Sequence, residues 1–493
     1  MEKVAIIELN ENELKLSIFK VNSCRWTVAM TQTQSFGLGK EIDRDELLSP
    51  QTRSDILGIL KVYRKMIERY GAGKIIAISS NILLRARNYR GFIDEIYNNT
   101  GLNFTIMSDE DQIKSIFYSV VNSIDNAKGV FIYVGNYKSY IVKYNRRAIL
   151  GSEILPFGSY NSIENDDFDA SIKTLKKQIK VKDLIGEGEE EINFVGAGNA
   201  FLSLGKLAKK ISRYPLDVDN NYVVDKETLD NTYNFIRGLE LDKIRKIKGV
   251  AYDDADKIAN GLAVIKAIYE ACNINEVTVS SANVRNGTFI QNVVMNSQER
   301  LTDLLTNSLD NYYEFSKDEF SINESVYNMA IILFKQLKVM HKLPRFYVKP
   351  LRIAAYMYDC GKSINAEDYV KYGFNKIVFS GISGASHREL LIAGFICTCQ
   401  NLDEFSLNEW IKYKDILTDE DLDAVRKLGV IVKLAVALNA SRKPIVQDIV
   451  CDILGDSIIM KTVVEGDASY EILEGMKVAH DYKKVYKKSL QII

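Results

Sequence analysis

The sequence predicts an α/β fold over 1–297, followed by a mostly helical region that ends in a small β hairpin. Over 1–297, short runs rich in β-branched residues, such as Lys74–Ser79, alternate with stretches whose apolar residues recur at helical spacing. After Ser297 the helical spacing dominates. A length of 493 residues also exceeds what one hydrophobic core usually supports, so we expect several domains.

The chain opens with two strands joined by a tight turn, Val4–Asn10 and Glu13–Lys20. A third strand then leads to Ser35–Gly39. Ser49-Pro50 offers a capping serine and a proline suited to the first helical position, so a helix is predicted to begin there.

The next group of elements begins with the strand Lys74–Ser79. A predicted helix follows, which carries Arg85–Asn88 and is closed by Gly101, and then a strand at Asn103–Met107. Ser108 is the expected cap of another helix, whose first turn holds three acids. Acidic side chains at the start of a helix beside a sheet are where an α/β protein could carry out a reaction. A simpler interpretation is that these acids cap the helix and complement its dipole.

A second hairpin is predicted from Gly129–Val134 and Tyr140–Tyr144. Further on, Gly196 and Gly198 follow a strand and begin a helix. The free amides of that helix could hold an anion, and tight packing of strand against helix explains the glycines equally well. Near the end of the chain, Ile458–Val464 and Tyr470–Leu473 are expected to pair as the terminal hairpin.

Composition and charge limit the classes of partner. Lys plus Arg total 64 and Asp plus Glu total 65, so no overall field draws the protein to nucleic acid or to an anionic membrane. No window approaches an uncharged membrane span, and Met1 leads directly into a strand without a signal peptide. We therefore expect a cytoplasmic protein with neither a membrane nor a nucleic-acid partner.

Three short motifs occur in order along the first part of the chain: Ser80 with Ala86–Asn88, Thr100–Leu102, and Met107-Ser108 with Glu110. They resemble the patterns ATSALREARN, tGL and ISGxEEARLIY of the exopolyphosphatase / guanosine pentaphosphate phosphohydrolase (Ppx/GppA) family. The resemblance implies two RNase H-like domains of the actin/hexokinase/sugar-kinase (ASKHA) type, over 1–124 and 125–297. The family's arginine in ALREARN falls on Leu84, and the adjacent arginine would point elsewhere on a helix.

The C-terminal half resembles the helical HD-type domain of longer family members. Leu351–Gly361 is similar to LLxxAAxLHDIG, and Val432–Asn439 to LLRLAVALdrS. The resemblance implies an HD-like domain over 298–455 and a small α+β segment over 456–493. Tyr358 stands at the HD histidine, so this domain is expected to be degenerate, without the HD metal centre.

For catalysis, the resemblance implies a general base in the xEEA motif, whose two carboxylates fall on Asp111 and Gln112. The base position is Gln112, and an amide cannot accept a proton at neutral pH. Glu110 or Asp111 could replace it only if the turn shifted, because adjacent helical residues do not share a face.

The two hairpins resemble the family's phosphate loops, in which glycine amides approach phosphate and carboxylates hold Mg²⁺. Glu8 occupies the metal-binding aspartate position of the first hairpin, where added acids favour an ordinary surface hairpin. Tyr133 and Tyr140 occupy the carboxylate positions of the second, where we expect them to fill the phosphate space and remove metal affinity. The residues that remain as phosphate-binding candidates by this resemblance are Gly135, Lys138, Ser139, Gly196, Gly198 and Arg285.

Three functions remain open. The first is a family member that has lost or greatly weakened phosphoanhydride hydrolysis and binds polyphosphate or a guanosine polyphosphate as a regulatory protein, without a cofactor. The second is an active exopolyphosphatase or pppGpp phosphohydrolase with an atypical Mg²⁺ site, and the third is a ligand-free structural subunit. The resemblance also implies a homodimer.

Overall fold

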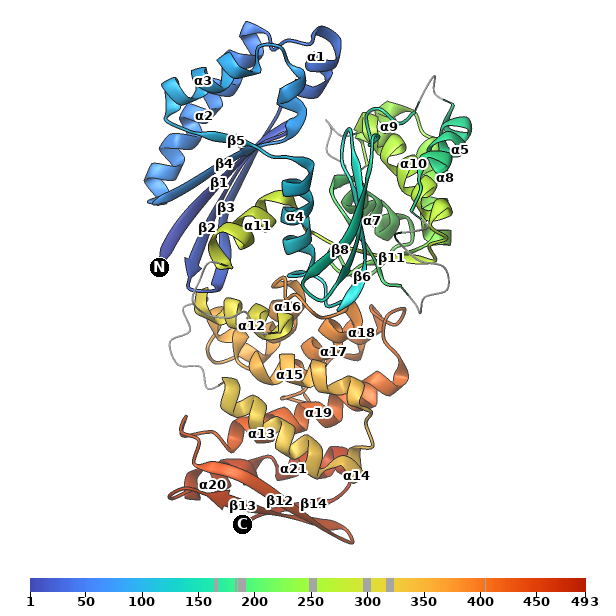
Figure 1. The fold of residues 1–493 in the computed structure, drawn as a ribbon. Helices are drawn as coiled ribbons and strands as arrows, with labels where there is room; N and C mark the ends of the chain where they lie inside the picture. The colour runs from blue at the N-terminus through green and yellow to red at the C-terminus, as the bar shows by residue number, and fades with distance from the viewer. Residues whose placement is uncertain are drawn as a thin grey trace. The chain divides into compact units, whose positions relative to one another are not determined.

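The structure is a computed structural model that describes residues 1–163, 167–181, 184, 192–247, 255–295, 303–315, 323–403 and 405–493. It divides into two compact units (Figure 1). The first comprises Met1–Tyr214 and Asp219–Asn307, and the second Pro215–Val218 and Ser308–Ile493. The α/β character of the N-terminal part is confirmed. The expected boundary between 297 and 298 lies outside the described residues.

The first sheet of unit 1 has the strand order β3-β2-β1-β4-β5. Its first three strands pair antiparallel, whereas β4 runs parallel to both β1 and β5. The predicted first hairpin is thereby confirmed. The strands are β1 Glu2–Leu9, β2 Glu13–Asn22, β3 Arg25–Ser35, β4 Lys74–Ser79 and β5 Phe104–Ile106.

Helices α1 (Leu38–Asp45), α2 (Pro50–Tyr70) and α3 (Tyr89–Thr100) pack with this sheet around one apolar core. The predicted start of α2 is confirmed, because Ser49 Oγ accepts a hydrogen bond from the Thr52 N–H. The expected end of α3 is confirmed as well, since Gly101 has a φ of 68°, a value that glycine adopts without strain.

The prediction of a helix through Arg85–Asn88 is wrong. Asn81–Arg85 forms a short 3₁₀ turn, Ala86 is extended, and α3 begins only at Tyr89. The reason is a contact distant in the sequence: the Asn88 amide accepts from the Leu48 N–H at 2.9 Å and donates to the Leu48 carbonyl at 2.8 Å. These bonds hold Asn88 to a neighbouring segment and start the helix later.

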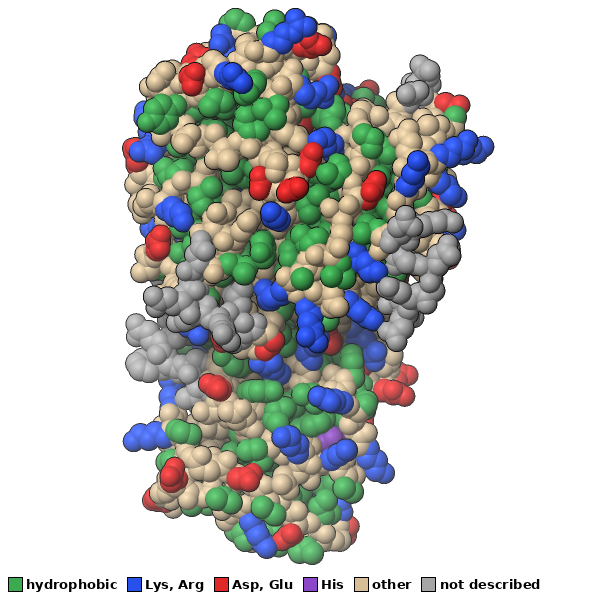
Figure 2. Space-filling view, in the orientation of Figure 1, with side chains coloured by type: hydrophobic (Ala, Val, Ile, Leu, Met, Phe, Trp, Pro, Cys, Tyr) green, Lys and Arg blue, Asp and Glu red, His purple; other side chains and the backbone are tan. Residues whose placement is uncertain are grey.

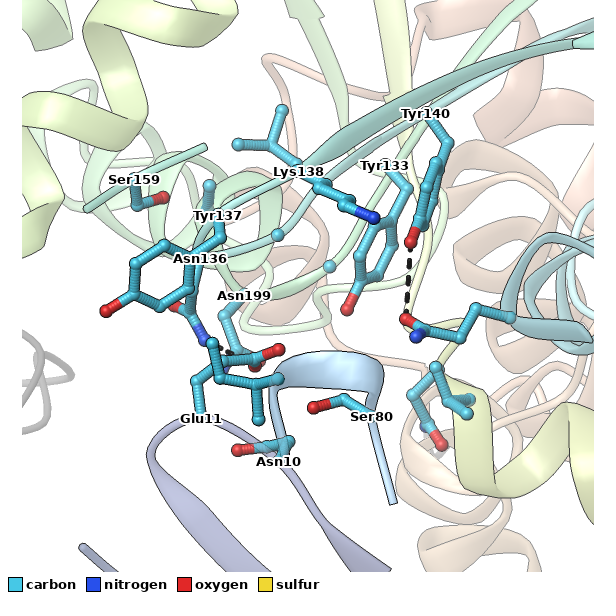
Figure 3. Close-up of a pocket in the computed structure, with 18 of the residues that line it drawn as sticks. Asn10, Glu11, Ser80, Tyr133, Asn136, Tyr137, Lys138, Tyr140, Ser159 and Asn199 are labelled. Carbon is cyan, nitrogen blue, oxygen red and sulfur yellow. Dashed lines mark hydrogen bonds between the residues drawn. The ribbon is translucent and has the colours of Figure 1, made fainter. Parts of the chain in front are cut away.

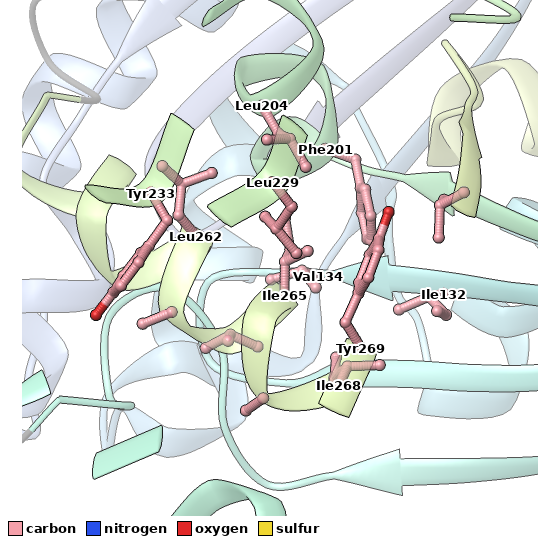
Figure 4. Close-up of a cluster of buried hydrophobic side chains, with 14 of the residues drawn as sticks. Ile132, Val134, Phe201, Leu204, Leu229, Tyr233, Leu262, Ile265, Ile268 and Tyr269 are labelled. Carbon is pink, nitrogen blue, oxygen red and sulfur yellow. The ribbon is translucent and has the colours of Figure 1, made fainter. Parts of the chain in front are cut away.

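The second sheet has the order β10-β11-β9-β6-β7-β8, and it contains the predicted second hairpin, β6–β7. The strands are β6 Lys128–Val134, β7 Ser139–Asn145, β8 Ala148–Leu155, β9 Phe194–Ala197, β10 Val223–Asp225 and β11 Glu276–Val279. The accompanying helices are α5 Phe168–Gln178, α7 Asn199–Ile211, α8 Lys226–Arg237, α9 Leu241–Arg245 and α10 Ala255–Ala271. Apolar side chains of β6, α7, α8 and α10 form the core of this lobe (Figure 4).

A third apolar cluster joins the two lobes into one unit. After β11 the chain returns to the first sheet as α11 (Val284–Phe289), which packs on α4 (Asp109–Val120). The Phe289 ring stacks on Phe19 of β2, with ring centroids 4.1 Å apart. A side chain at Gly287 would overlap the Ser115 carbonyl of α4, so this approach requires glycine.

The second unit is mostly helical, with a three-stranded sheet of order β12-β13-β14. Its longer helices are α13 Asn323–Gln336, α15 Val348–Tyr356, α16 Tyr369–Phe379, α17 His387–Thr398, α19 Asp419–Ala437, α20 Ser469–Lys477 and α21 Ala479–Tyr486, and α12, Leu304–Phe315, crosses the unit boundary. The sheet contains β12 Val446–Leu454, β13 Ser457–Val464 and β14 Ser489–Ile492.

A hairpin is present near the end of the chain, but the predicted pairing of its strands is wrong. Ser457–Val464 pairs antiparallel with Val446–Leu454, whereas Tyr470–Leu473 lies in α20. The Asp467 carboxylate accepts hydrogen bonds from the Ser469 N–H and hydroxyl, and this local turn directs the chain into a helix.

Charged side chains of both signs are interspersed over the face of the molecule in Figure 2, as the net charge of −1 leads one to expect. Within the described ranges, no helix combines the length and apolar character needed to cross a membrane.

Candidate functional site

Unit 1 contains a cavity of about 570 Å³ (Figure 3). Its walls come from the β1–β2 turn, the end of β4, the β6–β7 turn, the start of α7 and the segment that enters α11. At the β1–β2 hairpin, which the sequence favours as an ordinary surface hairpin, Glu8, Asn10 and Glu11 line the cavity.

The lining carries more positive than negative side chains. Among the described residues, five cationic side chains and two carboxylates contribute to it. The cations are Lys15, Arg85, Lys138, Lys257 and Arg285, and the carboxylates are Glu8 and Glu11. Several of these cations are paired with acids of the same unit, so the surplus of charge is partly neutralised before any ligand arrives.

Tyr133 and Tyr140 stand side by side on β6 and β7, with ring centroids 5.8 Å apart and planes 18° from parallel. The Tyr140 hydroxyl donates to Asp109 Oδ1 at 3.0 Å and lies 3.4 Å from Gln112 Oε1 (Figure 3, dashed). Burial raises the pKa of both phenols, so both are neutral at physiological pH. The tyrosines occupy part of the cleft, and the cavity persists beside them.

Asp109 is the acid that faces this pair, and sequence reasoning missed it. Its carboxylate accepts from Lys138 Nζ at 2.6 Å and from Asn81 Nδ2 at 2.9 Å, besides Tyr140. Burial opposes its ionisation, but these hydrogen bonds outweigh burial and lower the pKa of Asp109. One signal could have found it: Asp109 and Gln112 are three residues apart on a helix and share a face.

The predicted acids Glu110 and Asp111 lie elsewhere. Both are exposed, and neither lines the cavity. Asp111 instead forms a capping box with Ser108, whose hydroxyl accepts from the Asp111 N–H while the carboxylate accepts from the Ser108 N–H. The capping interpretation is therefore the right one for Asp111.

The glycine candidates differ in their surroundings. Gly135 and Gly198 line the cavity, and a side chain at either would meet the Tyr133 ring, at 3.2 and 3.0 Å respectively. Gly196 lies outside the lining, where its missing side chain makes room for the ring of Phe201. Packing against Phe201 therefore explains Gly196 without a ligand.

Ser139 is likewise unsuited to the predicted role, because its buried hydroxyl donates to the Phe157 carbonyl at 2.8 Å. Arg285 lines the cavity but is already paired: its Nη1 lies 2.7 Å from Glu8 Oε2, and its Nε donates to Ser17 Oγ at 3.1 Å. The Arg285 and Glu8 side chains are each 12% exposed, so the ion pair is largely buried.

Three successive residues of the β6–β7 turn contact the first lobe at three different elements. Asn136 donates to Glu11 of the β1–β2 turn at 3.2 Å, and Lys138 bonds to Asp109 of α4. Between them, the Tyr137 ring packs on Gly39 of α1. Arg85 also contacts the Tyr137 ring, at 5.4 Å from its centroid. The turn therefore bridges the cleft with its own side chains.

The side chains that could bind a metal ion do not cluster around the cavity. Across the part of the chain that the structure describes, no three His, Cys, Asp or Glu side chains come together as a metal site. Glu8, Glu11 and Asp109 are each engaged by a nitrogen donor of the protein. These residues do not fit the oxygen-rich coordination that Mg²⁺ requires.

No family model matches the chain, but searches among individual proteins find relatives. A bifunctional 3-dehydroquinate synthase/phosphatase of Fusobacterium nucleatum subsp. nucleatum is 22% identical over 325 residues, which is 59% of this chain and 48% of that protein. The chain thus spans about half of that relative. A guanosine-5'-triphosphate,3'-diphosphate pyrophosphatase of Aeromonas hydrophila subsp. hydrophila is 21% identical over 413 residues, 82% of this chain and 81% of the relative.

The fold agrees as well. The crystal structure of the Aquifex aeolicus Ppx/GppA family member superposes with a TM-score of 0.53 at 16% identity, over 60% of this chain and 99% of that one. A likeness at this identity establishes the fold of the N-terminal part. Together with the guanosine-5'-triphosphate,3'-diphosphate pyrophosphatase relatives, it supports membership of the chain in the Ppx/GppA family.

Proposed function

We propose that the protein binds polyphosphate or a guanosine polyphosphate in the cavity of unit 1 and acts as a binding or regulatory protein, with phosphoanhydride hydrolysis lost or greatly weakened. One observation carries the proposal. Tyr133 and Tyr140 stand where the resemblance implies carboxylates, and the Tyr140 hydroxyl is bonded to Asp109 and lies within 3.4 Å of Gln112 Oε1.

The chemistry of these groups supports weak hydrolysis. Gln112 stands at the position of the general base, and its amide cannot take a proton from water. Phosphoryl transfer depends mainly on metal and electrostatic positioning, and the carboxylates near the cavity are committed to Arg285, Asn136 and Lys138. Were Mg²⁺ bound, it would supply charge neutralisation on the phosphates.

Retained binding is supported by the charge and size of the cavity. The surplus of cationic side chains in the lining favours a negatively charged ligand. The volume of about 570 Å³ falls within the range of small-molecule sites. The start of α7 adds backbone amides beside Gly198, which complement an anion.

One observation favours a second candidate, an active phosphohydrolase with an atypical site. The Asp109 carboxylate contacts Lys138 and Tyr140 of the cavity wall, so it is the acid placed to accept a proton from water there. This role requires that Lys138 and Tyr140 release Asp109 when the substrate binds.

The resemblance supports further proposals at the level of the whole chain. These are RNase H-like domains over 1–124 and 125–297, a degenerate HD-like domain over 298–455, a terminal α+β segment over 456–493, and a cytoplasmic homodimer. Asp359, next to Tyr358 at the HD signature, is bonded to Lys362 at 3.2 Å, which suits a structural role for this carboxylate.

The test combines binding with turnover. Calorimetric titration with linear polyphosphate and with pppGpp is expected to detect binding, while phosphate release in Mg²⁺ stays at background. Robust release that Asp109→Asn abolishes and Asp111→Asn leaves intact would favour the active enzyme, since only Asp109 contacts the cavity residues. If calorimetry detects no binding of either ligand, the result would favour a structural subunit.

A further inference from the structure

We propose that the cavity binds a phosphoryl group directly, through hydrogen bonds from two neutral hydroxyls, those of Tyr133 and Ser80. The cavity would therefore bind its ligand without a metal ion. This inference rests on the proposed function, because it assigns a means of recognition to the same cavity. The two hydroxyls come from opposite lobes, and Figure 3 shows both directed into the space between them.

Ser80 has a hydroxyl that the protein leaves unused. The residue is 9% exposed, and its Oγ is buried without a hydrogen-bond partner among the described residues. Its backbone is already satisfied, since its N–H donates to the Leu9 carbonyl and its carbonyl accepts from Ser79 Oγ. A buried hydroxyl in a cavity wall without a partner is unfavourable in the ligand-free protein, and a ligand oxygen would relieve this.

Tyr133 is held rigidly in the facing wall. Its ring lies against Gly135 and Gly198 and stacks on Tyr140, which leaves the hydroxyl end directed into the cavity. No hydrogen bond joins this hydroxyl to a residue that the structure describes. Burial and the nearby Glu8, Glu11 and Glu13 carboxylates raise the pKa of Tyr133, so the phenol keeps its proton and acts as a donor.

The replacement of a carboxylate by a phenol changes how a phosphate can be held. An ionised carboxylate only accepts hydrogen bonds, so it reaches a phosphate oxygen through a cation. A phenol donates to that oxygen itself. The amides at the start of α7, a helix of 13 residues without a side-chain cap, line the same cavity at Gly198 and Asn199. Hydroxyls and amides together can therefore replace the cation.

The nearby acids do not cancel this arrangement. Arg285 neutralises Glu8 at 2.7 Å, and Glu11 accepts from Asn136. Lys257, a buried cation, also lines the cavity. A phosphoryl group between Ser80 and Tyr133 thus lies in a setting of donors and cations.

The experiment measures binding of linear inorganic tripolyphosphate by calorimetry, once in EDTA and once in Mg²⁺. We expect equal affinity in both, and a loss of about tenfold or more for Tyr133→Phe and for Ser80→Ala, because each removes one hydrogen bond to a charged group. Tyr144→Phe is the matched control, since it deletes the same atom from a buried tyrosine on β7 that lies outside the cavity.

The outcomes separate the two proposals. Binding only in Mg²⁺, or full affinity in both variants, overturns the hydroxyl inference and leaves the proposed function standing. Absence of tripolyphosphate binding in both buffers overturns the hydroxyl inference, and the proposed function falls as well if pppGpp also fails to bind. Thermal unfolding checks that each variant is folded, and if Tyr133→Phe is not, Ser80→Ala carries the same test from the opposite wall.

Discussion

Lys138 Nζ lies 2.6 Å from Asp109 Oδ2 and joins the β6–β7 turn of the second lobe to the start of α4 in the first. The ion pair joins the turn that the resemblance identifies as a phosphate loop to the helix that carries Gln112, the position of the implied general base. A ligand that enters the cavity must compete with Asp109 for Lys138. The ion pair therefore links the two walls of the cavity.

Asp109 is expected to contribute stability that depends on pH. The pKa of its carboxyl is lower in the folded chain than in the unfolded one, so the contribution is present above the ordinary pKa of about 4 and is lost as pH falls through the folded value. The free energy of unfolding of Asp109→Asn should be lower than that of the wild type near neutral pH, and the gap should narrow in acid. Denaturant titrations at several pH values measure this, and a gap that stays constant would contradict the assignment.

Gly39→Ala should loosen the bridge made by Tyr137. The added methyl would stand 2.8 Å from the Tyr137 ring, so the ring must move, at a cost of about 1–3 kcal/mol. Hydrogen exchange of the β6–β7 turn should rise accordingly. Gly37→Ala is the control, because no atom lies within 4 Å of the position its methyl would take.

The buried pair of Arg285 and Glu8 predicts non-additive effects. Arg285→Leu should lower the free energy of unfolding by about 3 kcal/mol, because it leaves Glu8 buried without its cation. Combining it with Glu8→Gln should recover part of that loss in a double-mutant cycle. Arg44→Gln, which removes an exposed pair with Asp45, should leave the free energy of unfolding almost unchanged, because solvent screens that pair.

Substituting alanine for glycine at two helical positions should change the stability of unit 1 in opposite directions. Gly287→Ala would drive a methyl into the Ser115 backbone and should destabilise the unit strongly, by more than about 3 kcal/mol. Gly91→Ala in α3 meets no atom within 4 Å and should stabilise by up to about 1 kcal/mol through helix propensity. Thermal or chemical unfolding of the two variants provides the comparison, and equal signs would contradict it.

Local signals in the sequence predicted much of the fold. The strands of both hairpins, the cap at Ser49 and the closing Gly101 depend on residues within a few positions of one another, and each was confirmed. The helix expected over Arg85–Asn88 failed because Asn88 is bonded to Leu48, a contact 40 positions away. Helix propensity over a short stretch of sequence contains no information about a contact with a residue so far along the chain.

The site was harder to predict for the same reason. Motif alignment drew attention to Asp111, whose side chain caps its own helix, while Asp109 faces Lys138 and Tyr140 from a position that the family fills with glycine. Arg285 and Glu8 are 277 positions apart, so their pairing appears only once α11 has returned to the first sheet. The chemistry of the side chains therefore indicated residues suited to a phosphate site, but it did not predict which residues they would contact.

The return of α11 also determines the order in which unit 1 can be completed during synthesis. Phe19 and Trp26 belong to the first strands made, yet the ring that covers both, Phe289, leaves the ribosome almost last within the unit. Until then the nascent first lobe exposes an aromatic surface, which is a site for chaperone capture or aggregation. A chain that stops before Val284 would keep that surface uncovered.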